Sequence, residues 1–362
     1  MNALQDKEFQ VLLTLLRAGL WERAVDDLSL FPLSGELWSR VFTLSCEQTV
    51  TGVVYRGISH LPNELMPTPD VMMRWVAQID AIERHNERMN STLCALYQTF
   101  IDAGLHPLLQ KGAGIAQMYE HPLLREAGDV DFWFAKEEWE QAAELVKHEA
   151  SDLERLADGS VSYHWRGVEV EHHLWMFDLC NPFKQRYLAS LIADTNIVIK
   201  EGQMGVRVPA PLTNIVLQNT HILKHAICLG VGLRQLCDLA RTYYALCGVL
   251  DGEQVQRVYD KLGVKRWSDM LHGFLVEHIG LEAKYLPYAI TSEEDTAKFL
   301  EEIRRGGNFG LHSEQRSAAN KSALRRKMHT FFSSISRVGF FMRYTPVEFI
   351  WRFGGLITRQ VR

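Results

Sequence analysis

The sequence of residues 108–134, LLQKGAGIAQMYEHPLLREAGDVDFWF, decides the fold and carries the candidate chemistry. Near its end, Asp129 and Asp131 are separated by one Val and lead into the aromatic run at 132–134. Side chains two residues apart on a strand point to the same side, so both carboxylates face one way. Two such carboxylates repel unless a cation lies between them, and Mg²⁺ prefers carboxylate oxygens together with substrate phosphates. The spacing predicts a Mg²⁺ or Mn²⁺ site at a strand end.

The first half of the same stretch predicts a strand, a turn of small residues and a helix. A short apolar run precedes the turn KGAG at 111–114, and helix-forming residues follow at 115–119. Glycine accepts conformations that other residues avoid and lets backbone N–H groups approach a phosphate. We expect Gly112 and Gly114 to have this role, with Lys111 as a nearby positive charge.

These residues resemble the nucleotidyltransferase superfamily with the DNA-polymerase-β-type core, and most closely an uncharacterised bacterial nucleotidyltransferase family within it. That family has a Lys-Gly turn, then a Tyr, a Pro and an Arg, and then Asp-x-Asp in an apolar strand. The matching positions are Lys111, Gly112, Tyr119, Pro122, Arg125, Asp129 and Asp131. By itself Asp-x-Asp is more often a solvated turn, and Lys-Gly-Ala-Gly departs from the superfamily's more usual Gly-Ser. The resemblance covers roughly residues 93–246 and implies that Arg125 and Lys111 neutralise phosphate charge.

The resemblance also implies a third carboxylate on a neighbouring strand. Residues 161–165 and 168–177 alternate as a hairpin does. The related family has an acid two residues before a His here, which matches Glu171 and His173, and we expect His173 to contact substrate. Glu169 lies one pleat away on the same face and is the second candidate, while an exposed polar face on an edge hairpin is the structural alternative.

A pair of histidines, His221 and His225, lies one helical turn apart on a helix predicted at 214–225. Zinc is one alternative, but zinc sites take three or four protein ligands and His-Glu-x-x-His is absent. We expect the pair to contact nucleotide phosphate or to complete a buried polar network, with Asp238 as an orienting partner. Simple helix packing is the structural alternative.

The whole chain predicts an α+β fold, a small mixed-sheet nucleotidyltransferase core flanked by helical N- and C-terminal regions. Ser34 is expected to cap an early helix, and a long helix is expected at 70–104. Asn86 and Asn90 on this helix are expected at solvated positions, with a place facing the site as the alternative. Four segments follow from these patterns: an N-terminal helical region, the core, a C-terminal helical region and a basic aromatic tail, at 1–104, 105–209, 210–320 and 321–362.

Composition excludes several classes of protein. Hydrophobic residues make up 47% of the 362 residues and charged residues 23%, which is ordinary for a globular chain. A net charge of −5 gives no strong nucleic-acid signal. No apolar run approaches the roughly 18 residues of a membrane span. Six scattered cysteines without Cys-x-x-Cys, and a start without signal-peptide character, predict a reducing cytoplasm and free thiols.

The tail from Arg325 onward is unlike the rest of the chain. It interleaves aromatic residues with eight basic residues and contains Glu348 as its single acid. Such a tail can bind RNA, an acidic partner or an anionic membrane surface, which would place the protein at the membrane periphery. The alternative is a helix that docks its aromatic residues on the domain and leaves its arginines in solvent.

Two functions from different classes fit these patterns. The first is metal-dependent transfer of an NMP group from an NTP to a hydroxyl, with Asp129 and Asp131 on the metal and Glu171 helping a second metal to activate the acceptor. A small molecule, a sugar, a protein side chain and a tRNA end all remain open as acceptors. The second is a catalytically silent binding or scaffold protein. Because Asp131→Asn removes a repulsion, we expect it barely to harm metal-free stability.

Overall fold

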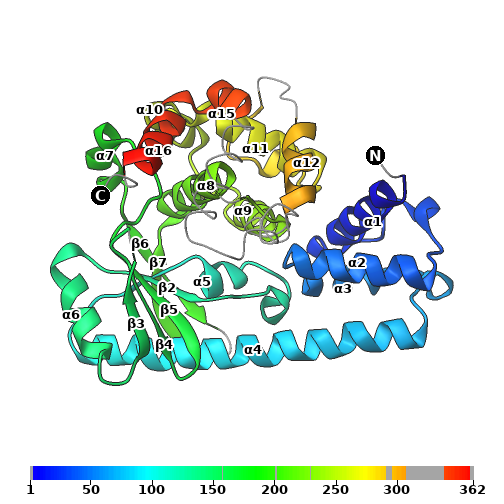
Figure 1. The fold of residues 1–362 in the computed structure, drawn as a ribbon, viewed down its shortest axis with the longest axis horizontal. Coiled ribbons are helices and arrows are strands. Elements are labelled where there is room, and N and C mark those ends of the chain that lie inside the picture. The colour runs from blue at the N-terminus through cyan, green and yellow to red at the C-terminus, as the bar shows by residue number, and fades with distance from the viewer. Residues whose placement is uncertain are drawn as a thin grey trace.

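A computed structural model describes residues 3–156, 158–199, 202–228, 230–290, 296–306 and 338–358. It combines a five-stranded mixed sheet with helices above and below it (Figure 1). This is the α+β class that the sequence predicts, with helical regions before and after the strands.

The N-terminal region consists of the helices α1 (Ala3–Leu20), α2 (Gly35–Glu47), α3 (Thr51–Ile58) and α4 (Pro69–Asp102). The predicted cap at Ser34 is confirmed, because its Oγ accepts a hydrogen bond from the Leu37 backbone N–H at 3.2 Å. Helix α4 has 34 residues and runs beneath the sheet and on to the first three helices (Figure 1).

Two polar residues of α4 correct the sequence prediction. Asn86 and Asn90 are buried rather than solvated. The Asn86 side-chain amide donates to the backbone carbonyls of Leu123 at 2.6 Å and Arg125 at 3.0 Å. Polar residues can occupy a buried helical face when they bond an irregular segment that lacks secondary-structure partners. Asn86 thereby fixes the loop that enters the aspartate strand.

The main sheet has the order β1-β2-β5-β4-β3. Its strands are β1 (Leu108–Gln110), β2 (Val130–Trp133), β3 (Ser151–Arg155), β4 (Val161–Trp165) and β5 (Val168–His173). Strands β2 and β5 are parallel neighbours, and the other pairs are antiparallel. The predicted hairpin is confirmed as β4 and β5, although β5 ends at His173 because its partner β2 ends opposite that residue.

The two faces of this sheet have different roles. Phe132 of β2 points toward α4, where its ring lies 5.6 Å from that of Phe100. Asp131, its neighbour in the chain, therefore faces the other side. On β5 the same alternation buries His172 beside Phe100 and turns Glu171 away from α4. The apolar face of the sheet packs on α4, and the face that carries Asp131 and Glu171 points away from α4.

Shorter elements complete the core. Helices α5 (Gly112–Ala116), α6 (Lys136–Val146) and α7 (Gln185–Ala189) join the strands, and β6 (Asp194–Ile199) pairs with β7 (Met204–Pro209) in a separate hairpin. The helix predicted at 115–119 is wrong in its bounds. It starts at Gly112 because the Lys111 carbonyl accepts from the N–H groups of Gly114 and Ile115, which closes the first turn three residues earlier.

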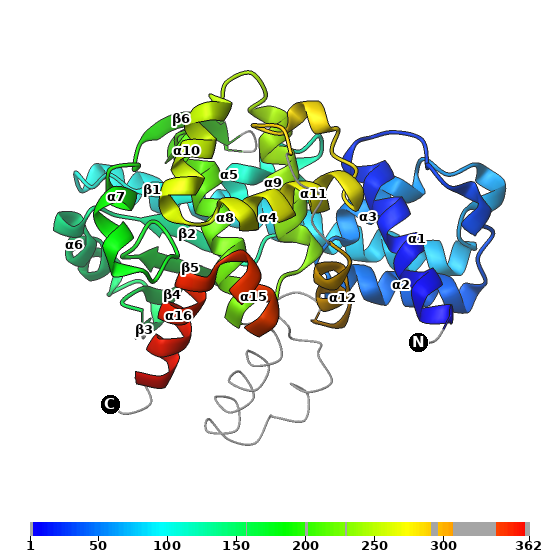
Figure 2. The same cartoon turned by 90° about the horizontal axis from the view of Figure 1, so that it is seen from above.

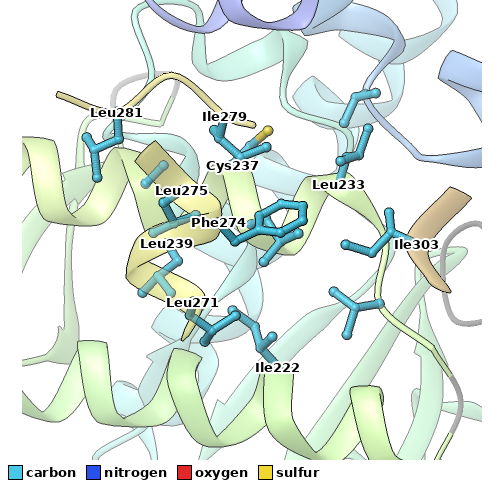
Figure 3. Packing of buried hydrophobic residues seen from close by; sticks show 14 of the residues in the cluster. Ile222, Leu233, Cys237, Leu239, Leu271, Phe274, Leu275, Ile279, Leu281 and Ile303 are labelled. Atoms are coloured by element: carbon cyan, nitrogen blue, oxygen red, sulfur yellow. The ribbon is translucent and has the colours of Figure 1, made fainter. Parts of the chain in front are cut away.

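The C-terminal region stacks helices above the sheet. They are α8 (Pro211–Cys228), α9 (Leu233–Ala245), α10 (Gly252–Leu262), α11 (Lys265–Glu277), α12 (Ala297–Gly306), α15 (Val338–Tyr344) and α16 (Pro346–Thr358). Figure 3 shows their shared apolar core, where Ile222 of α8, Leu239 of α9 and Phe274 of α11 are fully or almost fully buried. This packing fixes α8 and α9 above the acidic face.

The described part of the tail docks on the body. Figure 2 shows α15 and α16 beside α8, and Phe341, Tyr344 and Phe349 are buried. Arg343 is exposed, but Arg352 is buried, so the docked helices do not leave all their arginines in solvent. The other basic residues of the tail lie outside the described residues. No helix in the described ranges is long and apolar enough to cross a membrane.

Candidate active site

The parallel pairing of β2 and β5 sets Asp131 directly opposite Glu171. Ligand atoms of Asp131, Glu171 and His173 all lie within 4.8 Å of one another. His173 Nε2 is 2.5 Å from Asp131 Oδ1 and 3.5 Å from Glu171 Oε2. Glu169, the second candidate for the third acid, lies two residues before Glu171 on β5. Its side chain is exposed and does not line the pocket over these residues. The geometry therefore favours Glu171.

Asp129 precedes β2 and faces the same pocket, although it is not part of this three-residue group. The negative charge of Asp131, together with burial, raises the pKa of Asp129 to about 6. Burial and the same charge raise the pKa of Glu171 to about 7. Burial and the charge of Asp131 thus make both carboxylates costlier to ionise, even with Lys111 and His173 nearby, and a bound cation would offset that cost.

Asp131 itself behaves in the opposite way. Burial would raise its pKa, but the ammonium group of Lys111 and the hydrogen bond with His173 hold that pKa well below its usual range. Lys111 Nζ lies 3.3 Å from Asp131 Oδ2. Burial lowers the pKa of the Lys111 ammonium group, but the Asp131 carboxylate raises it, and the pKa of Lys111 is raised overall. Lys111 therefore stays protonated. Lys111 also has φ 45°, which non-glycine residues rarely adopt.

A pocket of about 390 Å³ lies over these groups, a size that suits a small ligand. Helices α8 and α9 supply the wall opposite the sheet. The predicted site residues that line it are Lys111, Gly112, Arg125, Asp129, Asp131, Glu171, His173, His221 and His225. Segments from four parts of the chain thus meet at one place.

Gly114 is the predicted site residue that this pocket does not include. A Cβ atom there would lie 3.4 Å from Val208 Cγ1 and 3.7 Å from Leu109 Cδ2. Close packing of α5 on β7 and β1, and not approach to a phosphate, is what favours a small residue here. Gly112 does line the pocket, and its φ of +42° favours glycine.

Arg125 and Asp238 form a buried pair. Arg125 Nη2 lies 2.6 Å from Asp238 Oδ2 and its Nε lies 3.1 Å from Oδ1, while Tyr119 donates its hydroxyl to Oδ1 at 2.8 Å. The expectation that Asp238 orients a histidine of α8 is therefore wrong, because the Arg125 fork and the Tyr119 hydroxyl bond its carboxylate. Arg125 therefore lines the pocket with its positive charge already paired with the Asp238 carboxylate.

The histidine of α8 is oriented by a residue that sequence reasoning missed. Asp178 accepts from Lys224 Nζ at 2.8 Å and lies 2.9 Å from His221 Nδ1. Burial and the charge of Lys111 lower the pKa of His221 to about 4, so the ring is neutral at pH 7. Asp178 follows an apolar and aromatic run, and a lone acid in such a run signals a buried carboxylate in need of partners.

Two more residues of the pocket were not singled out from the sequence. Arg234 donates through Nη1 to the Glu126 carbonyl at 2.9 Å, and its buried Nε has no hydrogen-bond partner among the described residues. The buried Oε1 of Gln218 also lacks one in the described part of the chain. Both side chains line the pocket. Buried polar atoms without partners indicate where a ligand completes the hydrogen bonding.

Comparison with known protein families matches residues 34–275 to the uncharacterised nucleotidyltransferases. The chain belongs to this family. The match covers more than half of the chain and contains every pocket residue named above. It ends within α11, so α12, α15 and α16 lie outside it.

Other comparisons add little to the assignment to the nucleotidyltransferase family. The crystal structure of an antigenic nucleotidyltransferase-like protein from Paracoccidioides brasiliensis is 14% identical, with 53% of this chain and 92% of that chain covered and a TM-score of 0.32. A TM-score this low carries no argument about fold or function. No curated protein matches the chain.

The residues present fit a divalent metal ion. Asp131 and Glu171 offer carboxylate oxygens and His173 offers a ring nitrogen, and Asp129 adds a nearby carboxylate with a raised pKa. Oxygen-rich sets of this kind suit Mg²⁺ and Mn²⁺. Neither His221 nor His225 belongs to a group of three or more ligand residues in the described ranges, so the zinc interpretation gains no support.

Proposed function

We propose that this protein is a metal-dependent nucleotidyltransferase that moves an NMP group from an NTP to a hydroxyl acceptor. The observation that carries the proposal is the convergence of Asp131, Glu171 and His173 in a pocket that Asp129 also lines. Asp129, Asp131 and Glu171 would hold the metal. When bound, Mg²⁺ supplies charge neutralisation at the triphosphate and makes the acceptor hydroxyl more acidic.

The charged side chains of the pocket have complementary tasks. Asp131 would help to hold the metal, and Lys111, whose Nζ lies 3.3 Å from Asp131 Oδ2, would place its ammonium group beside a phosphate oxygen bound there. Arg234 has a buried Nε donor for a second oxygen. His221 donates its Nδ1–H to Asp178, so its neutral ring presents Nε2 as an acceptor for an N–H or O–H group of a ligand and not as a donor to phosphate. The pocket therefore offers donors where an NTP carries negative charge.

The transfer step follows from this arrangement. The acceptor oxygen forms a bond to the α-phosphorus, the bond from that phosphorus to the α–β bridging oxygen breaks, and pyrophosphate leaves with the bonding pair. Glu171 would help to hold the ion that makes the acceptor hydroxyl more acidic, and the hydroxyl proton leaves to bulk water.

Pyrophosphate release tests this proposal. The wild type is incubated with each NTP, Mg²⁺ or Mn²⁺ and a mixture of hydroxylated acceptors, beside Glu171→Gln and Glu169→Gln. Both substitutions remove one carboxylate from the same face of β5, but only Glu171 lines the pocket. We expect metal-dependent release by the wild type and Glu169→Gln, and a loss of at least about a hundredfold in Glu171→Gln. Equal rates in the two variants would overturn the assignment of Glu171.

One observation favours a catalytically silent binding protein as the second candidate. Lys111 forms an ion pair with Asp131, and His173 lies within hydrogen-bond distance of it, so the chain itself supplies partners to this carboxylate in the absence of a metal ion. This candidate predicts that nucleotide binds without divalent metal and that no pyrophosphate appears with any acceptor. Calorimetry of ATP binding with and without Mg²⁺ separates the two candidates.

A further inference from the structure

A second pocket opens beside the carboxylates. Its volume is about 750 Å³, and its walls come from the segment after β5, from α7, from the end of α8 and from α16. It shares Asp158, His173 and Lys224 with the first pocket, so the two pockets are neighbours. A molecule bound in the second pocket would lie next to the group that the first pocket activates.

Aromatic side chains form the rim of this second pocket. Trp175 is 59% exposed and Trp351 is 41% exposed, although both are large and apolar. Phe183 is 81% exposed, and its ring centroid lies 6.0 Å from that of Trp351. Exposed apolar groups that gather around one cavity mark a binding surface. The flat faces of the indoles suit a ring that is itself flat or presents C–H groups.

One residue that lines the pocket carries a buried hydrogen-bond donor without a partner among the described residues. Arg352 is 9% exposed, lines the pocket, and has a buried Nε with no partner among the described residues. The rest of its guanidinium group bonds Glu348 at 3.2 Å and the Asp178 carbonyl. The exposed carboxylate of Asp158 lies on another wall and can accept a hydrogen bond. The pocket thus combines aromatic faces with separate donor and acceptor groups.

The charges of this pocket disfavour a polyanionic ligand. Two permanent cations line it within the described residues, Lys224 and Arg352. Lys224 is bonded to Asp178, and Arg352 is bonded to Glu348. Nucleic-acid binding depends on cations that are free to replace counterions at phosphates. A neutral ligand with hydroxyl groups fits better.

We infer that the second pocket binds the acceptor and that the acceptor is a small molecule with a sugar ring. A sugar ring has C–H groups on its faces and hydroxyls on its edges, which matches indoles at the rim and the Arg352 Nε and Asp158 carboxylate on the walls. Its role as acceptor rests on the proposed function. Its place beside His173 brings a ring hydroxyl toward Glu171.

Helix α16 of the tail forms part of the wall of the second pocket. Glu348 accepts from the backbone N–H groups of Cys180 at 2.6 Å and Asn181 at 3.2 Å, which ties α16 to the segment after β5. Trp351 and Arg352 then complete the pocket. Both lie outside the family match at 34–275.

Binding of simple glycosides, without nucleotide, tests the inference. The probes are the methyl glycosides of glucose, galactose, mannose and glucosamine, observed by saturation-transfer NMR on the full chain. The variants are Trp351→Ala on α16 and Trp175→Ala on the segment after β5. Ile350→Ala is the matched control, because Ile350 is exposed on α16 but does not line the pocket.

We expect the wild type and Ile350→Ala to bind at least one glycoside, with affinity reduced about tenfold or more in both tryptophan variants. Trp175→Ala keeps the test valid if Trp351→Ala loosens α16. The inference is overturned if no glycoside binds the wild type, if both tryptophan variants bind as the wild type does, or if a short RNA or peptide binds there instead. Calorimetry of Mg²⁺–ATP binding to the same variants shows whether the nucleotide site is intact, so a failure of the sugar pocket is distinguished from a failure of the proposed function.

Discussion

Replacing Asp129 with Asn should make the metal-free protein more stable at neutral and alkaline pH. In the wild type, Asp131 and burial raise the pKa of Asp129 from 3.8 to about 6. The folded protein then binds a proton more tightly than the unfolded chain does, so stability falls as pH rises from about 4 to about 6 and stays low above that. An asparagine does not titrate, so the variant escapes this loss.

The size of the gain follows from the shift. A change of about 2 pKa units corresponds to about 3 kcal/mol as an upper limit. The Asp129 side chain is only partly buried by surface area, and solvent screens its repulsion from Asp131. We therefore expect a gain of about 1–2 kcal/mol above pH 6 or so and little gain near pH 4.

Urea denaturation of the metal-free protein across this pH range measures the effect. Glu169→Gln is the matched control, because it removes an exposed carboxylate of the neighbouring strand that does not line the pocket. A destabilised Asp129→Asn variant, or a gain of the same size at every pH, would refute the reasoning about paired carboxylates.

Asp131→Asn should destabilise the metal-free protein by about 3–5 kcal/mol in urea denaturation, because Lys111 and His173 lose a buried partner; an unchanged stability would contradict the pairing. Asp238→Asn should lower the free energy of unfolding by a similar amount, roughly 3–5 kcal/mol, because the buried Arg125 charge loses its partner. A variant that unfolds at the wild-type temperature in calorimetry would contradict this prediction. Mg²⁺ with an NTP should raise the melting temperature of the wild type and have much less effect on Glu171→Gln; the same rise in both would exclude Glu171 from the metal site. If the basic tail binds an anionic surface, the full chain should sediment with phosphatidylserine vesicles at low salt and not with neutral vesicles, whereas equal sedimentation would argue against it.

Local spacing and the family resemblance together indicated where the candidate site lies, although Asp129 precedes β2 and is not part of the group formed by Asp131, Glu171 and His173. The period of two residues relates Asp129 to Asp131 and Glu171 to His173, and the hairpin turn at 166–167 sets the register of β5. These relations depend on neighbours in the chain and on strand geometry alone. The resemblance to nucleotidyltransferases added the expectation that the two strands meet.

The partners of the charged residues could not be predicted in the same way. Arg125 and Asp238 are 113 residues apart, and Asp178 and His221 are 43 residues apart. Such pairs depend on how helices pack over the sheet, which no local period encodes. Without these contacts the sequence assigns Asp238 to a histidine and treats Asp131 as one half of a repelling pair, whereas in the structure Lys111 and His173 both contact Asp131.

ATP labelled separately at its α- and γ-phosphates tests the central claim most directly. The wild type is incubated with each label, Mg²⁺ and the glycoside that binds most tightly, beside Asp131→Asn. Nucleotidyl transfer predicts that the α-label moves to the acceptor and the γ-label appears in pyrophosphate, only with metal and not in the variant. Transfer of the γ-label to the acceptor, or tight metal-free binding of ATP with neither label released under any acceptor, would contradict the claim.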